Sequence, residues 1–109
     1  MTVAELKESL SLIPVSLPDG EREVEGVYIG DLLSWVMGRA QADNAWLTIM
    51  SNLNIVAVAT LADVSCIILC EGVIPDEGVT ATAQAKGVNI LSTERTAFHT
   101  AKALAELGL

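Results

Sequence analysis

The chain has 109 residues, and its 14 acidic against 6 basic residues give a formal net charge of −8. Hydrophobic residues make up 51% and aromatic residues only 4%, so we expect one domain, residues 1–109, with an aliphatic core. This apolar content excludes an intrinsically disordered chain, and the acidity argues against nucleic acid or an anionic membrane surface as a partner.

The chain also lacks the signals of export or membrane insertion. Its longest apolar run, residues 55–62, falls far short of the ~18 residues that a membrane-spanning helix needs. No basic segment followed by an apolar stretch opens the sequence, so we expect no signal peptide. The two cysteines are therefore expected to be reduced thiols in the cytoplasm.

The first 25 residues predict a short helix, a strand and a turn. Thr2 and Glu5 have the spacing of a capping box, in which each side chain bonds the backbone of the other residue. We therefore expect a helix that runs to about Leu10. Residues 12–17 are expected to form a strand, and Pro18-Asp19-Gly20 is typical of a turn.

An extended segment and a second helix are expected next. Residues 23–29 are polar at first and then apolar, and Gly30 interrupts them. Asp31 is predicted to cap the helix that follows, because Asp is a favoured N-cap residue. The apolar stripe expected on this helix consists of Leu32, Leu33, Val36, Met37 and Ala40.

Residues 45–70 contain a single charged residue, Asp63, and should lie deep in the domain. The nearly continuous apolar runs at 45–50 and 65–70 are typical of central parallel strands. By periodicity alone, residues 55–63 between them are compatible with a buried strand or a buried helix. We expect a helix, because parallel neighbours are usually joined by a helical crossover.

The last third of the chain continues the alternation of helices and strands. Pro75 is expected to open a helix that Gly87 closes, and residues 88–91 are expected to form a strand. A final helix is expected from Thr93 or Glu94, with an apolar face of Ala97, Phe98, Ala101, Leu104 and Ala105. The pattern predicts an α/β fold, a three-layer α/β/α domain with a mainly parallel central sheet.

Small polar residues follow three of the predicted strands. Ligands of open α/β sheets bind beyond the carboxyl ends of the strands, so this edge is the candidate ligand-binding site. The same residue types are also common in turns and helix caps, which is the structural alternative. The candidate ligand-binding residues are Ser51, Asn52, Glu71, Gly72, Ser92 and Thr93.

No combination of residues predicts catalysis or metal binding. Cys66 and Cys70 would lie about 13 Å apart on a strand, too far for a disulfide or a shared metal ion. Phosphate-loop and dinucleotide motifs are absent, and the single histidine, His99, is expected on the solvent side of the last helix. We expect no metal, no cofactor and no enzymatic activity; Glu71 or Glu94 as a general base is the weaker alternative.

Several spaced segments resemble the DRTGG domain family, in particular its freestanding small members, over about residues 1–107. Many members have Thr-Gly-Gly after the central strand, where this chain has Cys70-Glu71-Gly72, and Glu71 there would repel an anion. The segments that carry the resemblance are residues 26–34, 45–49, 54–59, 67–72, 90–93 and 96–98.

The resemblance implies a small α/β/α domain that tends to dimerise. It is similar to the N-terminal domain of HPr kinase/phosphorylase, without the kinase half that carries the phosphate-binding loop. Related domains in some phosphotransacetylases and inorganic pyrophosphatases look like regulatory modules. Freestanding members are often encoded near iron-hydrogenase or redox-complex subunits.

Two functions follow from these observations. The first is a non-catalytic regulatory or protein-interaction domain that acts as a homodimer, accessory to a redox (hydrogenase-type) or metabolic enzyme complex. The second is a sensor that binds a nucleotide or another metabolite at the carboxyl ends of the strands. For the first, the apolar excess predicts a partner-facing surface that includes Trp35, Trp46, Val73 and Ile74.

Overall fold

A computed structural model of the chain describes residues 1–109 as five helices and a five-stranded sheet. Helices and strands alternate from β2 to the end of the chain, as the apolar pattern predicts. The elements are α1 (Val3–Leu10), β1 (Ile13–Ser16), β2 (Val27–Ile29), α2 (Leu33–Arg39), β3 (Ala45–Thr48), α3 (Asn54–Ala62), β4 (Cys66–Leu69), α4 (Val79–Lys86), β5 (Ile90–Ser92) and α5 (Ala97–Glu106).

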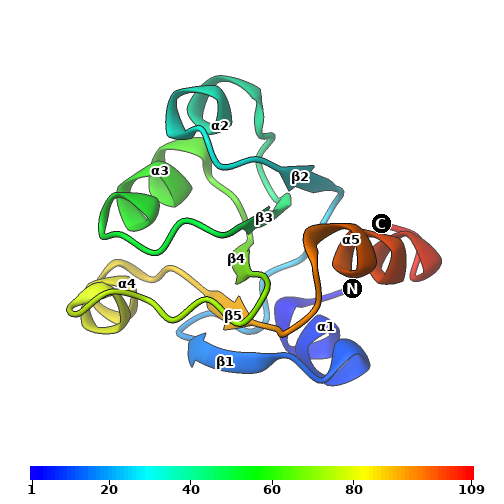
Figure 1. Cartoon of the computed structure of the whole chain (residues 1–109). Coiled ribbons are helices and arrows are strands. Elements are labelled where there is room, and N and C mark those ends of the chain that lie inside the picture. Colours follow the sequence, from blue (N-terminus) through cyan, green and yellow to red (C-terminus); the bar gives the residue numbers. More distant parts are fainter.

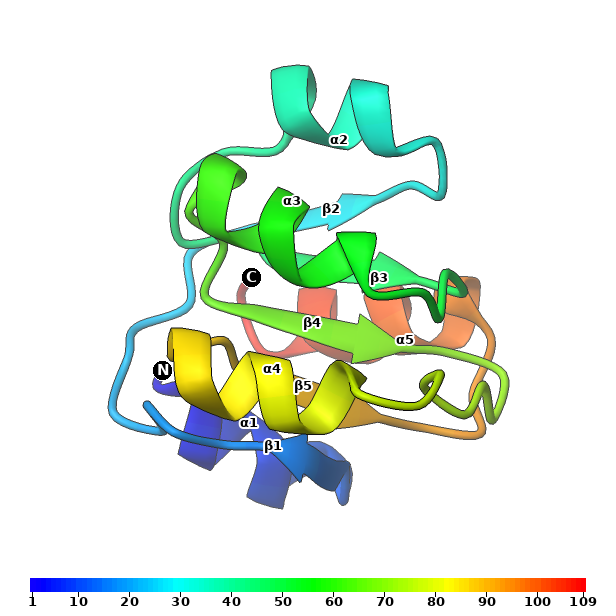
Figure 2. The ribbon, with the colours of Figure 1, turned by 90° about the vertical axis from the view of Figure 1, so that its left-hand side faces the viewer.

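The sheet has the strand order β1-β5-β4-β3-β2. Strands β2 to β5 are parallel to one another, and β1 pairs antiparallel with β5 at one edge. The three connections β2–β3, β3–β4 and β4–β5 each lead to the next strand in the same direction across the sheet. Because such crossovers share one handedness, all the intervening helices lie on one face. Accordingly α2, α3 and α4 cover one face, and α1 and α5 cover the other (Figures 1 and 2). The predicted three-layer α/β/α architecture is confirmed.

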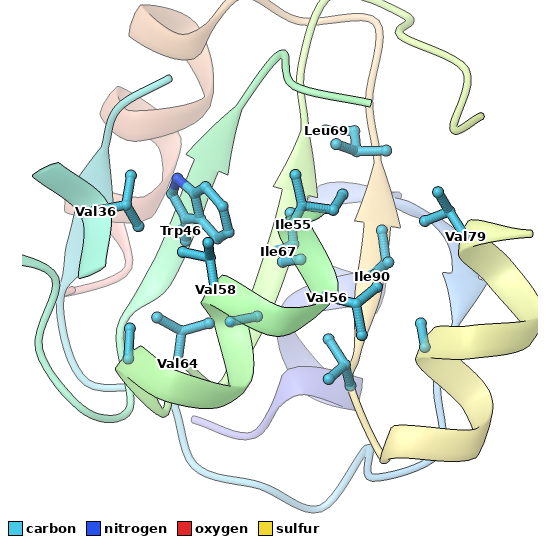
Figure 3. Packing of buried hydrophobic residues seen from close by; sticks show 14 residues of the cluster. Val36, Trp46, Ile55, Val56, Val58, Val64, Ile67, Leu69, Val79 and Ile90 are labelled. Carbon is cyan, nitrogen blue, oxygen red and sulfur yellow. The ribbon is translucent and has the colours of Figure 1, made fainter. Parts of the chain in front are cut away.

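Two apolar clusters fill the spaces between the layers. Every residue of β3 and β4 is buried, because helices cover both faces of these central strands. Trp46 is the largest side chain of the cluster under α2, α3 and α4, where it lies close to Val36 and Val58 (Figure 3). Its indole Nε1 donates to the Gly30 carbonyl at 2.8 Å, so the one polar atom of the ring is satisfied.

The predicted helix termini are partly confirmed. The capping box of α1 is present in both directions, and the backbone N–H of Thr2 holds the pKa of the Glu5 carboxyl below its ordinary value. Gly87 ends α4 with φ +73°, a left-handed conformation that suits glycine. The predicted start of α4 at Pro75 is wrong by about one turn, because the helix begins at Val79.

Two further predictions are corrected by the structure. Asp31 does not cap α2; its Oδ1 accepts from Thr48 Oγ1 at 2.7 Å and from the Ile49 N–H at 3.0 Å, which ties β2 to β3. Phe98 does not lie on the buried face of α5. That face centres on Thr100 and Leu104, because the Thr100 hydroxyl is satisfied by the Thr96 carbonyl and can be buried.

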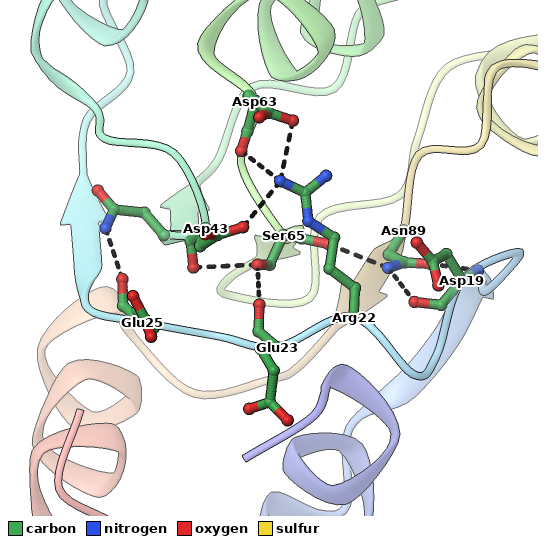
Figure 4. A network of polar contacts seen from close by, with 9 residues as sticks. Asp19, Arg22, Glu23, Glu25, Asp43, Asp63, Ser65 and Asn89 are labelled. Atoms are coloured by element: carbon green, nitrogen blue, oxygen red, sulfur yellow. Dashed lines mark hydrogen bonds and ion pairs between the residues drawn. The ribbon is translucent and has the colours of Figure 1, made fainter.

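A polar network holds the long connection between β1 and β2 across the amino ends of the parallel strands (Figure 4). The guanidinium of Arg22 contacts Asp43 Oδ1 at 3.0 Å and Asp63 Oδ1 at 2.9 Å, and it also donates to the Asp63 carbonyl. Partial burial of the guanidinium lowers the pKa of Arg22, but the contacts with Asp43 and Asp63 together outweigh it and raise that pKa. Ser65 donates to the Glu23 and Asp43 carbonyls, so the connection is fixed to β4 as well. All buried side-chain polar atoms are satisfied, and this cluster is structural.

Candidate functional site

The predicted ligand-binding residues follow neighbouring strands at the carboxyl edge of the sheet. Thr48, Leu69 and Ser92 are register partners across β3, β4 and β5, so the segments after them start side by side. The strand order therefore gathers the segments at 51–52, 71–72 and 92–93 along one edge, as expected from the parallel arrangement. No cavity is found there; both hollows of the surface lie against α3 and α4.

The turn after β4 does not form a cradle for an anion. Glu71 and Gly72 both have left-handed backbones, with φ +60° and +70°. Their N–H groups nevertheless point into the protein: Glu71 donates to the Arg95 carbonyl at 2.8 Å and Gly72 to the Thr93 carbonyl at 2.9 Å. An anion nest needs free, converging N–H groups, and this turn has already used them.

Thr93 is equally occupied by the protein itself. It is buried, its N–H donates to the Leu69 carbonyl, and its Oγ1 accepts from the Arg95 N–H at 3.2 Å. The Arg95 guanidinium donates to Thr93 Oγ1 and to the Leu10 carbonyl at 2.8 Å, which joins this edge to α1. Ser92 is half-buried at the end of β5.

Ser51 bonds the β4–α4 loop, and Asn52 bonds within its own loop. Ser51 Oγ donates to Asp76 Oδ1 at 2.9 Å, and the Asp76 N–H donates to the Ser51 carbonyl at 2.9 Å. Asn52 Oδ1 accepts from the Asn54 N–H, which organises the start of α3. All six candidate residues thus have defined structural partners, Ser92 through its strand pairing with Ile13 and Leu69. The alternative explanation as turn and loop residues accounts for the contacts of the other five.

The charge of this edge opposes an anionic ligand. The exposed carboxylates there belong to Asp31, Glu71, Asp76 and Glu94, against the single guanidinium of Arg95. No three His, Cys, Asp or Glu side chains anywhere in the chain lie close enough together to hold a metal ion. A phosphate group would therefore meet net repulsion at this edge.

The two cysteines are buried free thiols. Burial raises the pKa of Cys66 to about 12, so this thiol stays protonated at neutral pH. Burial also raises the pKa of Cys70, with a further contribution from the Glu71 carboxylate, while the Thr100 hydroxyl opposes the shift. Neither thiol has the exposed, electropositive surroundings of a reactive cysteine.

The structure separates the four residues predicted to face a partner. Trp35 on α2 is 52% exposed and Ile74 in the β4–α4 loop is 82% exposed, while Val73 is half-buried. The prediction for Trp46 is wrong, because β3 is a central strand and turns this side chain into the core. The Trp35 ring is covered on one side by the Arg39 guanidinium, 3.6 Å from the ring centroid.

The hollow between α3 and α4 is not among the sites predicted from the sequence. Its volume is about 490 Å³, and a smaller hollow of about 140 Å³ shares Thr60 and Lys86 with it. A signal was present, because residues 54–62 contain no charged side chain. The larger hollow is lined by Leu53, Asn54, Val56, Ala57, Thr60, Leu61, Thr82 and Lys86.

Comparison with known proteins agrees with the fold. Residues 18–107 match the profile of the DRTGG domain. A similar solved structure is the crystal structure of the CBS and DRTGG domains of the regulatory region of Clostridium perfringens pyrophosphatase, complexed with the activator diadenosine tetraphosphate. The similarity covers 94% of this chain and 45% of that one, with a TM-score of 0.72 and 12% sequence identity.

This chain therefore spans less than half the length of that regulatory region. With 12% sequence identity, the structural similarity shows that the two share a fold and nothing more. No curated protein sequence matches the chain significantly. None of its helices combines the length and apolar character required to cross a membrane.

Proposed function

The chain belongs to the DRTGG domain family, and from that premise we propose that it is a non-catalytic regulatory or protein-interaction domain that acts as a homodimer. In this proposal residues 1–109 form a single domain in the cytoplasm. Its role is accessory to a redox (hydrogenase-type) or metabolic enzyme complex. The similar pyrophosphatase structure, which is a regulatory region, supports a regulatory role.

The exposed aromatic ring of Trp35 carries the interaction part of the proposal. Trp and Arg are enriched at the centres of protein interfaces, and Trp35 lies on α2 with the Arg39 guanidinium against it. Ile74, the most exposed large apolar side chain of the protein, adds a second apolar contact. Both thiols are buried, which gives no support to thiol-based catalysis.

Sedimentation equilibrium tests the homodimer. We expect the chain to be dimeric at micromolar concentration, and Trp35→Glu and Ile74→Glu each to weaken the dimer by at least about tenfold. Phe98→Glu is the matched control, because Phe98 is also an exposed apolar residue but lies on the opposite face, on α5. A monomeric wild-type chain, or equal effects of all three substitutions, contradicts the proposal.

The alternative function is a nucleotide or metabolite sensor at the carboxyl edge of the sheet. The pyrophosphatase regulatory region complexed with diadenosine tetraphosphate motivates it. Thermal shift with diadenosine tetraphosphate, ATP and AMP decides between the two, since a ligand at 100 times its Kd adds about 2.7 kcal/mol to the free energy of unfolding. We expect no shift, because the edge is acidic; a shift lost in Ser51→Ala and Thr93→Val would favour the sensor.

A further inference from the structure

The two edges of the sheet differ in how they are protected from pairing with another strand. The outer edge of β1 is interrupted by Pro14, which has no N–H, and by a shift in register between Pro14 and Ser16. Strand β2, at the other edge, has no such interruption, because residues 26–30 contain neither a proline nor a charged side chain. An edge strand without these features is open to a further strand.

The backbone of β2 leaves its outer hydrogen-bonding groups free. The carbonyl of Gly26 and the N–H of Gly30 bond β3, at 3.0 and 3.2 Å. Successive residues of a strand direct their N–H and C=O groups to opposite sides, so Val27 and Ile29 direct theirs away from β3. Because β2 is the last strand in the sheet order, no strand of this chain lies beyond it.

Helix α2 presents exposed apolar side chains on the same side of the molecule. It is the outermost helix of its layer, with α3 on one flank only (Figure 2). Val36 points into the core, and α2 runs opposite to β2. The right-handed winding of such a helix turns Leu32 and Trp35 to the flank away from α3, where they are 57% and 52% exposed. The exposed ring of Trp35 therefore lies beside the open edge.

The charges of this side permit the approach of a second copy. The chain carries a net charge of −8, so a contact between two copies is opposed wherever acids meet. Residues 26–42, which run from β2 through α2, include one acid, Asp31, and one base, Arg39. The Asp31 carboxylate is turned toward β3, where it accepts from Thr48 Oγ1 and the Ile49 N–H. This segment is therefore neutral, unlike the chain as a whole.

We propose that the homodimer forms by antiparallel pairing of two β2 strands through their outer edges, which joins the two sheets into one. The inference rests on the proposed homodimer and names its contact. With Tyr28 at the two-fold axis, the N–H and C=O of Val27 bond those of Ile29 in the second copy, and the reverse. The axis is perpendicular to the sheet, so the two α2 helices lie on one face with Trp35 toward the contact. Because the β1 edge is blocked, the assembly closes at two copies.

Hydrogen exchange of the wild-type chain tests the pairing without any substitution. The Val27 and Ile29 amides have no partner within one chain, so they exchange freely unless a second copy covers them. We expect both to exchange at least about tenfold more slowly above the dissociation constant of the dimer than below it.

Substitutions at the two edges test the same contact by sedimentation equilibrium. Ile29→Pro removes an outward N–H and leaves the bonds to β3 in place, and Ile29→Lys adds the charge that commonly protects an edge strand. We expect each to weaken the dimer at least about tenfold. Ile13→Lys is the matched control, because Ile13 is an exposed isoleucine on the other edge strand, and it should leave the dimer unchanged.

The outcomes separate the edge pairing from the homodimer itself. A dimer whose Val27 and Ile29 amides exchange as fast as in the monomer, or that both Ile29 variants leave intact, overturns the edge pairing and keeps the homodimer. The same holds for a dimer that only Ile74→Glu dissociates, since its contact would then be the β4–α4 loop. A wild-type chain that stays monomeric overturns both proposals.

Discussion

Gly72 and Glu94 are packed together at the carboxyl edge of the sheet, so that a Cβ atom on residue 72 would lie 2.5 Å from Glu94 Oε2. Gly72 also has φ +70°, where a side chain is strained. We therefore expect Gly72→Ala to lower the free energy of unfolding by about 1–2 kcal/mol. Urea denaturation measures it.

Gly38→Ala is the control, because Gly38 lies in α2 without a positive φ and with open space around its Cβ position. It should instead stabilise the protein by about 0.5–1 kcal/mol. In the double variant Gly72→Ala/Glu94→Ala the side-chain contact is relieved and the backbone strain stays. Full recovery of stability in that variant would show that backbone strain is not the main cause.

The elements that could be predicted from the sequence depend on neighbours a few residues away. The capping box of Thr2 and Glu5 and the left-handed terminus at Gly87 are local chemistry, and both are present. The crossover helix expected at 55–63 is present at 54–62, and it could be predicted because parallel strands on either side require one. The same reasoning gave the three-layer arrangement, since continuous apolar runs indicate strands covered on both faces.

The partners of the candidate site could not be predicted, because they join distant parts of the chain. Glu71 bonds the Arg95 carbonyl, and Ser51 bonds Asp76, contacts that no local pattern encodes. Trp46 at a partner face conflicts with the prediction that residues 45–50 form a central strand covered on both faces. The structure places it on β3, between β2 and β4, where it is buried.

Asn89 illustrates a buried polar residue whose contribution can be measured. Its Oδ1 accepts from the Asp19 N–H at 3.0 Å, and its Nδ2 donates to the Asp19 and Ser65 carbonyls at 2.8 and 3.0 Å (Figure 4). Asn89→Ala leaves these groups without partners, and we expect it to lower the free energy of unfolding by at least about 2 kcal/mol.

Asn89→Asp tests the amide nitrogen separately from the amide oxygen, because it replaces only the nitrogen. The carboxylate keeps the bond from the Asp19 N–H but faces two carbonyl oxygens, so at neutral pH we expect it to be at least as destabilising as Asn89→Ala. On acidification the protonated carboxyl can donate again, and part of the stability should return. An Asn89→Asp variant whose stability does not improve on acidification, relative to Asn89→Ala, contradicts this account of the amide nitrogen.

Substitution of the two tryptophans should change the stability of the protein to very different extents. Trp46→Phe removes the hydrogen bond from the indole Nε1 to the Gly30 carbonyl and leaves part of the core unfilled. We therefore expect the free energy of unfolding to fall by about 1–3 kcal/mol. Trp35→Phe should change it by less than about 0.5 kcal/mol, because Trp35 is half exposed. In Trp35→Phe the remaining fluorescence comes from Trp46 and should resist acrylamide; strong quenching would contradict its burial.

The Cys66 thiol should make the protein lose stability at alkaline pH. Burial holds its pKa at about 12 in the folded chain, against an ordinary value of 9.0. Between these values the unfolded chain has released the proton and the folded chain has not, so the unfolded state binds fewer protons and stability falls as pH rises. The slope from this one group is about 1.4 kcal/mol per pH unit.

Cys66→Ala isolates that contribution, because it removes the titrating group from both states. Urea denaturation of the two proteins under reducing conditions, from pH 8 to about pH 11, gives the difference in slope. Cys66→Ala should be the less stable protein at pH 8, since it leaves a small cavity between β4 and the α1–α5 layer. The difference in the free energy of unfolding between the two proteins should then narrow above the ordinary thiol pKa. Only the wild type loses stability there, because its folded state keeps a buried thiol protonated that the unfolded chain would ionise. Curves that stay parallel to pH 11 would show that Cys66 is ionised as readily in the folded chain as in the unfolded one.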